Sequence, residues 1–370
     1  MVEWKELGEV AKLVRGKVIS KDYIRDFEGE YPVYSSQTTN DGVLGNINSY
    51  MFDGDYLTWT TDGAYAGTIF RRKGKFSITN VCGLIDITCS NIQQDFLYFW
   101  LSKTAKNYVL EGMGNPKLMS NVASTIPIPI PSLKEQIRIV GILDTFTASI
   151  DNLKEQIAQR RKQYEYYRDQ LLDLEGKPGV EMKSLGEVGE FIRGAGILKS
   201  DFVAEGFPCI HYGQIHTKYG ISATKAFSQI DETLYKKCKK AVKGDIVLAT
   251  TSEDAEGCAK PVAWLGEEEV AVSGDAYIYH HNQNGKFMAY QFMTHNFMLF
   301  KIMNATGAKV VRISGDIMAK YEFPLPSLEE QQRIVSILDT FEASIQNLEA
   351  QLSQREKQYE YYRNKLLTFE

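Results

Sequence analysis

Short loops rich in serine, threonine, glutamine and asparagine carry the side chains of this 370-residue chain that suit the reading of nucleic-acid bases. Their amide and hydroxyl groups match the donors and acceptors on base edges. Later in each half, a turn that carries Lys or Arg could hold a phosphate. For any single loop or turn, the alternative is an ordinary solvated surface segment. The candidate contacts are Ser35, Ser36, Gln37, Thr38, Thr60, Thr61, Asn115, Lys117, His211, Tyr212, Gln214, Thr250, Thr251, Ser252, Lys309 and Arg312.

Other chemistries have weaker support in the sequence. Cys209, His211 and His216 could suggest a metal site, but the sequence offers no fourth ligand and no counterpart in the first half. Asp254, Glu256 and Lys260 only loosely resemble nuclease carboxylates. Phosphate-binding, dinucleotide-binding and zinc-protease motifs are missing from the chain. We therefore expect no catalytic residue, no metal and no cofactor in this protein.

The chain contains two copies of the elements that would position these loops. Residues 131–172 and 326–367 match at 30 of 42 positions, at a constant offset of 195. A shorter echo, at an offset of 178, opens each half at residues 2–16 and 180–194. The sequences between the echoes show no obvious likeness. Repeated segments around divergent globular domains indicate one shared structural frame that carries two domains with different binding loops.

Each long repeat predicts a helix that pairs with its twin. A proline-rich lead precedes Ser132 and Glu135 in the first copy, which form a capping-box pattern, and Ser327 and Glu330 repeat it in the second. Apolar residues then recur at heptad spacing, which is typical of a coiled coil. Packing of each helix on its own domain, or on another chain, is the alternative. The predicted seam contains Leu143, Phe146, Ile150, Leu153, Ile157, Tyr164, Tyr167, Leu338, Phe341, Ile345, Leu348, Leu352, Tyr359 and Tyr362.

The predicted fold is α+β, with two globular domains joined by two long antiparallel coiled-coil helices and a pseudo-two-fold internal duplication. A helix of 42 residues spans roughly 60 Å, so the second helix can pair with the first only by running back along it. We expect a first domain at 1–130, a central helix at 131–175, a second domain at 176–325 and a final helix at 326–370. Within the domains we expect strands at 31–34, 54–60, 67–70, 76–78, 245–249, 262–264 and 276–279, and helices at 95–110 and 287–303.

Composition limits the class of protein. Lys and Arg number 42 against 47 Asp and Glu, giving a net charge of −5 that is spread evenly. An even, slightly acidic chain argues against strong nonspecific binding of nucleic acid, unless a partner supplies most phosphate contacts. Composition and motifs predict a cytoplasmic protein that does not contact a membrane. The five cysteines are odd in number and form no CxxC, no apolar run reaches membrane-spanning length, and the sequence shows no secretory signal.

The repeated P-S-L-x-E-Q-x-R-I-V-x-I-L-D segment and the alternation of constant and variable regions resemble the specificity subunits of type I restriction-modification systems. The resemblance covers the whole chain. It implies two target-recognition domains, each reading one half of a bipartite site in double-stranded DNA. It also implies that the long helices set the spacing between the half-sites.

The same resemblance implies a non-catalytic subunit. Two methyltransferase (modification) subunits would dock around the frame, and restriction subunits can join them. S-adenosylmethionine, ATP and Mg would then act only in those partners. Two other classes of function stay open at this point: a coiled-coil adaptor with two ligand-binding heads, and a stand-alone DNA-binding regulator.

Overall fold

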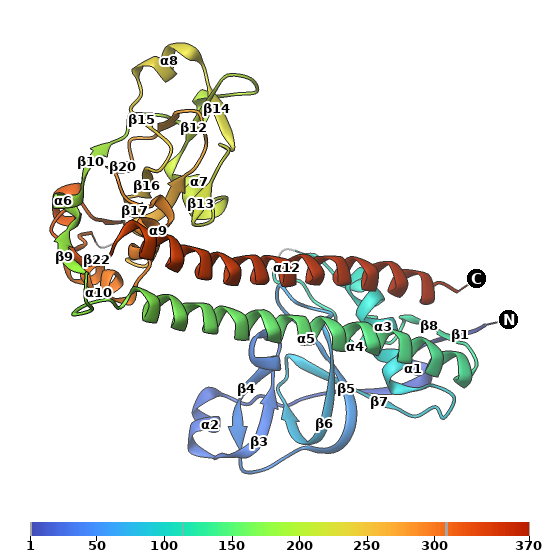
Figure 1. Cartoon of the computed structure of the whole chain (residues 1–370). Helices are drawn as coiled ribbons and strands as arrows, with labels where there is room; N and C mark the ends of the chain where they lie inside the picture. The colour runs from blue at the N-terminus through green and yellow to red at the C-terminus, as the bar shows by residue number, and fades with distance from the viewer. Residues whose placement is uncertain (1, 113, 308–309, 370) are drawn as a thin grey trace. The chain divides into compact units, whose positions relative to one another are not determined.

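The computed structural model describes residues 2–112, 114–307 and 310–369, and the chain divides into two compact units (Figure 1). One unit comprises Met1–Leu153 with Gln351–Glu370, and the other comprises Lys154–Ala350. Each unit therefore contains one globular domain and parts of both long helices, α5 (Leu133–Leu172) and α12 (Leu328–Leu366). The domain boundaries expected from the sequence stay predictions, because these units are divided within the helices.

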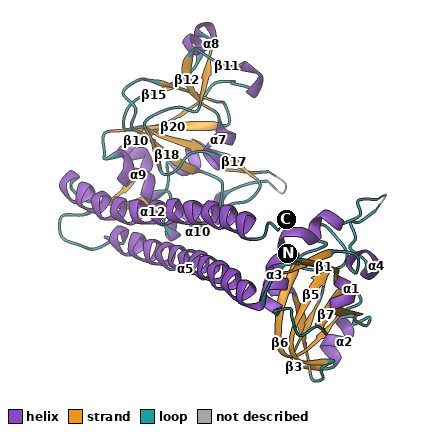
Figure 2. Ribbon diagram, turned by 90° about the vertical axis from the view of Figure 1, so that its right-hand side faces the viewer, coloured by secondary structure: helices purple, strands orange, loops and turns teal. Residues whose placement is uncertain are grey.

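The first domain is built on a six-stranded sheet with the strand order β2-β7-β5-β6-β3-β4 (Figure 2). Strands β1 and β8 form a separate two-stranded ribbon. Most neighbours are antiparallel, but β3 and β6 run parallel. The elements are β1 (Glu3–Glu6), α1 (Leu7–Val10), β2 (Ala11–Arg15), α2 (Lys21–Asp26), β3 (Glu28–Tyr34), η1 (Thr39–Gly42), β4 (Val43–Ile47), β5 (Phe52–Thr60), β6 (Ile69–Ile78), β7 (Cys82–Ile87), α3 (Gln94–Thr104), η2 (Ala105–Tyr108), α4 (Ser120–Ala123) and β8 (Pro127–Ile130).

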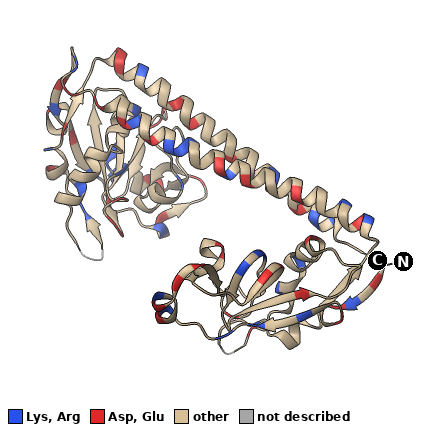
Figure 3. Cartoon of the chain, turned by 90° about the horizontal axis from the view of Figure 1, so that it is seen from below, with Lys and Arg blue, Asp and Glu red and all other residues tan. Residues whose placement is uncertain are grey.

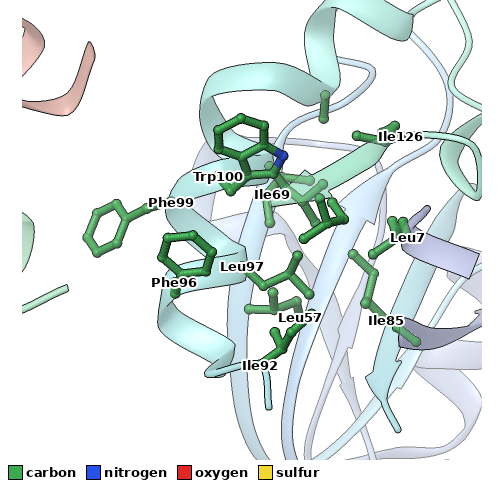
Figure 4. Packing of buried hydrophobic residues seen from close by; sticks show 14 of the residues in the cluster. Leu7, Leu57, Ile69, Ile85, Ile92, Phe96, Leu97, Phe99, Trp100 and Ile126 are labelled. Carbon is green, nitrogen blue, oxygen red and sulfur yellow. The ribbon is translucent and has the colours of Figure 1, made fainter. Parts of the chain in front are cut away.

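Helix α3 joins the sheet of this domain to the long helices. Leu97 lies against the sheet residue Leu57, whereas Phe99 projects from the opposite side of α3 (Figure 4). All three side chains are fully buried, and the same cluster contains Leu143 of α5. Burying a leucine or phenylalanine side chain contributes about 1.5–3 kcal/mol, so this continuous core fixes α5 to the first domain.

The second domain contains two five-stranded sheets and two short ribbons. The sheets have the orders β10-β20-β16-β18-β13 and β11-β14-β12-β19-β15. The strands are β9 (Glu181–Ser184), β10 (Gly189–Arg193), β11 (Phe202–Val203), β12 (Phe207–Ile210), β13 (Ser222–Ala223), β14 (Ser228–Ile230), β15 (Lys240–Ala241), β16 (Ile246–Ala249), β17 (Thr251–Ser252), β18 (Lys260–Trp264), β19 (Val270–Val272), β20 (Ala276–His281), β21 (Val311–Arg312) and β22 (Glu322–Leu325). The helices are α6 (Leu185–Val188), η3 (Lys199–Asp201), α7 (Tyr212–Thr217), α8 (Glu232–Lys237), α9 (Gly285–Gln291), α10 (His295–Asn304) and α11 (Gly315–Met318).

The two domains share one strand plan despite their different sequences. The run β2-β7-β5-β6 of the first domain corresponds to β10-β20-β16-β18 of the second. The parallel pair of β3 with β6, Val33 opposite Ser77, corresponds to the pair of β12 with β19, Cys209 opposite Ala271. One strand of the first domain, β6, thus takes the place of two strands in the second, β18 and β19.

The helix expected at 95–110 is divided into α3 and η2, and two further expectations about these elements were wrong in detail. Two separate strands at 67–70 and 76–78 were expected, but β6 runs unbroken between them. Lys73 faces Asp55 across the strand pair, and Lys75 faces Asp53, so opposite charges support a strand whose middle is polar. A single helix at 287–303 was also expected, but the segment forms α9 and α10, because the Thr294 hydroxyl accepts the Phe297 N–H and starts a new helix.

A buried glutamine attaches each long helix to its own domain. The Gln136 amide of α5 donates to the Pro131 and Asn91 carbonyls, both at 2.9 Å, and its oxygen accepts the Gln93 N–H at 2.8 Å. Gln331 of α12, its twin in the repeat, donates to the Pro326 carbonyl and the Gln283 side chain, and accepts the Asn284 N–H. Neither glutamine is exposed to solvent. Gln93 and Asn284 cap α3 and α9, so each glutamine holds the start of a domain helix.

A twin acid adds a second point of attachment. Asp144 of α5 accepts Arg71 of the first domain at 3.0 Å. Asp339 of α12, which is 195 residues further on, accepts Lys286 of the second domain at 2.5 Å. The two long helices therefore use the same glutamine and aspartate to contact their domains, although the domain residues that bond them differ.

The long helices pair with each other inside each unit and run in opposite directions (Figure 1). In the first unit Phe146 stacks on Tyr362, with ring centroids 5.3 Å apart and an interplanar angle of 26°. In the second unit Tyr167 stacks on Phe341 at 5.5 Å and the same angle. Phe146 and Phe341 are twins in the repeat, as are Tyr167 and Tyr362, so one contact occurs twice. Other seam residues, including Leu143, Ile150, Ile157 and Leu338, are buried.

Each long helix begins at the serine that the sequence predicted. The Ser132 hydroxyl accepts the Glu135 N–H at 3.4 Å, and Ser327 does the same for Glu330 at 3.3 Å. The two glutamate carboxylates pair with Arg138 and Arg333 respectively, one turn further along. The proline-rich leads are extended as β8 and β22, which pair with β1 and β9 of the repeated opening segment.

Candidate nucleic-acid interface

Three loops and one returning segment gather at one end of the sheet in the first domain. They are the loop after β3, the β5–β6 loop, the β6–β7 turn and the segment before α4. The Leu118 N–H donates to the Thr61 carbonyl at 2.9 Å, and the Gly63 N–H donates to the Pro116 carbonyl at 3.0 Å. An open cavity of about 360 Å³ is lined by Ile19, Ser35, Ser36, Gln37, Leu44, Asp62, Gly63, Ala64, Tyr65, Thr79, Asn80 and Val81. We call this end the first reading edge.

Most first-domain candidates lie at this edge, but not all of them face solvent. Ser36, Gln37 and Thr38 are partly exposed, and Asn115 and Lys117 are exposed. Thr60 and Thr61 are buried: the Thr60 hydroxyl donates to the Tyr65 carbonyl, and the Thr61 hydroxyl donates to the Asp62 carboxylate at 2.6 Å. Their placement suits a role in shaping the β5–β6 loop, whereas Asn115 and Lys117 are placed to meet a ligand.

A buried arginine holds the loop after β3. The Arg72 side chain is 1% exposed, and its Nη1 donates to the Asp41 carboxylate at 2.7 Å. Its Nε donates to the Thr58 hydroxyl at 3.2 Å, and its guanidinium carbon lies 3.6 Å from the centre of the Tyr34 ring. Asn40 and Asp41 have φ angles of +50°, which non-glycine residues rarely adopt. Arg72 therefore fixes a strained loop that carries Ser35, Ser36, Gln37 and Thr38.

In the second domain the candidates after β12 lie at the corresponding place, but two of them are mostly buried. His211 is 6% exposed and Gln214 is 7% exposed. Burial lowers the pKa of His211, so the ring is neutral and its Nδ1 accepts the Gly213 N–H at 3.2 Å. The Gln214 amide donates to the Ser228 hydroxyl at 2.6 Å. Tyr212 is partly exposed and is the better placed of the three.

The remaining second-domain candidates meet in a short ribbon. Thr251 and Ser252 of β17 pair with Arg312 and Val311 of β21, and Arg312 is exposed. Thr250 is mostly buried and its hydroxyl donates to the Asp275 carbonyl at 3.1 Å. Lys309 lies outside the residues that the structure describes. We call the end formed by this ribbon and the loop after β12 the second reading edge.

A buried cation holds this edge too. Lys301 of α10 is 3% exposed, and its ammonium donates to the Glu256 and Cys258 carbonyls, both at 2.8 Å. Burial lowers its pKa to about 8. Ala259, beside these carbonyls, has a φ of +55°. Lys301 thus secures the strained segment after Ser252, much as Arg72 secures the loop after Tyr34.

Among the described residues the weakly suggested metal grouping does not assemble, whereas Asp254, Glu256 and Lys260 line one open cavity together with His216. Cys209 is fully buried, and the His216 Nε2 lies 3.0 Å from the Thr251 carbonyl. The Asp254 carboxylate accepts the Gly257 N–H, and the Lys260 ammonium donates to the His216 carbonyl. Across residues 2–112, 114–307 and 310–369, no cluster of three His, Cys, Asp or Glu could hold a metal ion.

Charge is mixed over the part of the chain that the structure describes. Lys and Arg alternate with Asp and Glu on both domains and both long helices, without a basic block (Figure 3). At the first reading edge, Asp62 lies 3.8 Å from both Arg15 and Lys117. No helix described here is long and apolar enough to cross a membrane.

Sequence reasoning missed four functional candidates, all of them basic. Lys301 interrupts the apolar run Phe297–Ile302, and such an interruption is the signal that could have found it. Arg72 lies between Arg71 and Lys73, in a basic stretch that gives no such signal. Arg15 and Arg193 occupy the same position of the repeated opening segment, and each lies at a reading edge.

Comparison with known proteins agrees with these features. The sequence profile described as "Type I restriction modification DNA specificity domain" matches residues 1–160 and again 178–356. A Mycoplasma pneumoniae protein described as a type I specificity subunit, S.MpnORF507P, is 31% identical over 368 residues, which cover 98% of this chain and 96% of that protein. The specificity subunit of the type I restriction enzyme MpnII, from the same organism, is 40% identical over 172 residues, or 45% of this chain and 52% of that protein.

Solved structures show the same fold. The type I S subunit from M. genitalium has a TM-score of 0.62 and 14% identity, with 100% of this chain and 97% of that chain covered. A chain from a study of assembly and conformational transition in a type I restriction-modification system has a TM-score of 0.60 and 16% identity, with 99% and 96% covered. On the double profile match and the full-length relative, this chain belongs to the family of type I restriction-modification DNA specificity subunits.

Proposed function

We propose that the protein selects the DNA sequence on which a type I restriction-modification complex acts, with each domain reading one half of a bipartite site. The observation that carries this proposal is the pair of domains with one strand plan and different loop residues at the two reading edges. Loops on a rigid scaffold can vary in side chain without loss of fold, and base contacts specify the sequence.

We propose that the long helices set the distance between the half-sites. Each is attached to a domain by a buried glutamine and an aspartate, and the two helices pair through the aromatic stacks. A continuous α-helix of 40 residues, such as α5, is a stiff element. The frame can therefore hold its reading edges at a set separation.

Chemistry would belong to partner subunits in the cytoplasm. We propose that two methyltransferase subunits dock on the frame and use S-adenosylmethionine, and that restriction subunits with ATP and Mg act in the larger complex. A net charge of −5 leaves few phosphate contacts to this chain alone, so partners would supply much of the affinity for the DNA backbone.

Reconstitution tests the proposal. The purified chain should bind a duplex weakly and without sequence preference, and adding the modification subunit encoded with it should produce specific, strongly salt-dependent binding and adenine or cytosine methylation of a bipartite motif. The readout is sequencing of the methylated bases. Methylation by the isolated chain would contradict the non-catalytic role. Specific binding that needs no partner would favour the stand-alone regulator, and a lack of DNA binding by the assembled complex would favour the adaptor.

A domain exchange tests the independence of the two readers. Replacing residues 17–125 by the same region of a relative keeps the repeated opening segment, the lead before α5 and both long helices. The methylated motif should change in one half only, because the second reading edge lies wholly within residues 195–325. The reciprocal exchange of residues 195–322 is the matched control and should change the other half. A motif altered in both halves by either exchange would show that the domains read jointly.

A further inference from the structure

Two arginines end corresponding strands at the reading edges. Arg15 ends β2 and Arg193 ends β10, and both are followed by glycine in the repeated opening segment. A Cβ on Gly16 would lie 2.1 Å from the Ile78 carbonyl oxygen, and one on Gly194 would lie 2.2 Å from that of Ser273. Only glycine allows the backbone to pass this close to the neighbouring turn, so the chain path after each arginine is fixed.

Each arginine side chain is held by the same part of its domain. The Arg15 Nε donates to the Asn80 carbonyl at 3.1 Å, and the Arg193 Nε donates to the Gly274 carbonyl at 3.0 Å. Asn80 follows Thr79 in the β6–β7 turn, and Gly274 follows Ser273 in the β19–β20 turn. The Thr79 and Ser273 N–H groups donate to Tyr34 and Ile210, the last residues of β3 and β12, so the two turns correspond.

The surroundings of the two arginines differ. At the first edge, Asp62 lies 3.8 Å from Arg15, and at the second, the adjoining loop carries Thr251 and Ser252. A residue that reads bases should vary with the loops around it, because different half-sites need different contacts. An arginine kept at one place beside two unrelated sets of loops serves features that both halves share. Within the domains that feature is the turn carbonyl, and in any DNA sequence it is the phosphate backbone.

The chemistry of the side chain suits that task. A guanidinium has five N–H donors in a planar fork that matches a phosphate. The Arg15 Nη2 also donates to the Asn80 carbonyl and its Nη1 donates to the Met119 sulfur at 3.6 Å, so two N–H donors of its terminal nitrogens remain. The Arg15 side chain is 30% exposed and Arg193 is exposed. Holding Nε on a backbone carbonyl orients the rest of the fork and reduces the entropy lost on binding.

We propose that Arg15 and Arg193 are matched phosphate contacts, one for each half-site, which place the DNA backbone at the same position on both domains whatever bases are read. This inference rests on the proposed function. It adds two positioning residues that belong to the repeated frame, beside the variable loops that specify the bases.

The test measures specific binding by the reconstituted complex as a function of salt. Arg15→Gln and Arg193→Gln remove the charge but keep an N–H donor that can reach the turn. The logarithm of the association constant falls as the logarithm of the salt concentration rises, and each variant should reduce the magnitude of this negative slope by about 0.9. The double variant should reduce it by about twice that, since one phosphate contact releases about 0.9 counterion. The methylated motif should stay unchanged in both halves. Arg15→Lys and Arg193→Lys keep the charge and should keep the wild-type slope.

Arg138→Gln and Arg333→Gln are the matched controls, because they are twin exposed arginines on the long helices, paired with Glu135 and Glu330. Their slopes should equal the wild-type slope. An unchanged slope in the Arg15 and Arg193 variants, or a relaxed base preference in one half-site, would overturn the inference while leaving the proposed function intact. If the wild-type complex methylates no specific motif, the proposed function fails, and this inference fails with it. Should a glutamine variant not fold, the lysine variants decide: a slope lowered by lysine contradicts a simple charge contact.

Discussion

Replacing Gln136 by methionine is expected to lower the free energy of unfolding of the first unit by about 3 kcal/mol. The methionine fills a similar volume but cannot satisfy the Gln93 N–H or the Pro131 and Asn91 carbonyls, which bond the glutamine at 2.8–2.9 Å. Each polar group left buried without a partner costs about 1–3 kcal/mol, and partial access of water to Gln93 and Asn91 keeps the total below the sum. Gln331→Met should act on the second unit to a similar extent.

The measurement is urea or thermal unfolding followed by a probe for each unit, such as hydrogen exchange of α3 and α9. Gln354→Met is the matched control: it makes the same substitution at an exposed position of α12 and should change stability by less than about 0.5 kcal/mol. The Gln136 and Gln331 effects should add, because the two glutamines share no partner. A loss at Gln136 no larger than that at Gln354 would show that the hydrogen bonds of this glutamine add nothing to stability.

Inserting one heptad after Gln159 and another after Gln354 is expected to widen the gap between the half-sites by one to three base pairs. Seven residues add roughly 10 Å of helix and keep the seam in phase. At ~3.4 Å per base pair, that length corresponds to about three base pairs if it is transmitted in full. Both aromatic stacks lie outside the insertions, and so do Gln136 and Gln331, so each half-site should stay the same. Sequencing of the methylated motif gives the result directly.

A two-residue insertion after Gln159 alone should abolish methylation. Two residues rotate the following helix by about 200°, since each residue turns it by about 100°. Tyr167 would then leave the face that meets Phe341, while Phe146 would still face Tyr362. A heptad inserted in α5 alone is the control that changes helix length without rotating the seam. This variant should also lose methylation, because the distance between the two stacking residues of α5 would exceed that in α12. An unchanged gap in an active double-heptad variant would show that the helices do not set the spacing.

The long helices were predictable because their signals are local and repeated. Ser132 and Ser327 mark the helix starts, and the heptads mark one face, which contains the phenylalanines and tyrosines that the structure brings together in the two stacks. Their antiparallel pairing followed from helix length and chain connectivity. None of these deductions needed knowledge of the globular domains.

The sheets and the reading edges were harder to predict, because they depend on contacts between distant residues. The parallel pair of Val33 with Ser77 joins strands that have no local signal for each other. The polar character of Thr60 and Thr61 indicated the right loop, but burial within that loop depends on the segment that returns at Leu118. Arg72 lies in a basic stretch and Lys301 in an apolar run, and only the fold shows that each has a loop to hold.

The reciprocal stacks make the two copies of the helix interchangeable at their principal aromatic contact. A phenylalanine from either copy meets a tyrosine from the other, so a chain in which one copy has been overwritten by its twin keeps both stacks. Homogenisation of the repeats is therefore tolerated at Phe146, Phe341, Tyr167 and Tyr362. Homogenisation would remove contacts only at positions where the copies differ, such as Thr147 and its equivalent Glu342. The Glu342 carboxylate lies 4.0 Å from the Lys286 ammonium, and a threonine there would lose this ion pair. The two copies can thus become identical one position at a time while α5 and α12 still pair through both aromatic stacks.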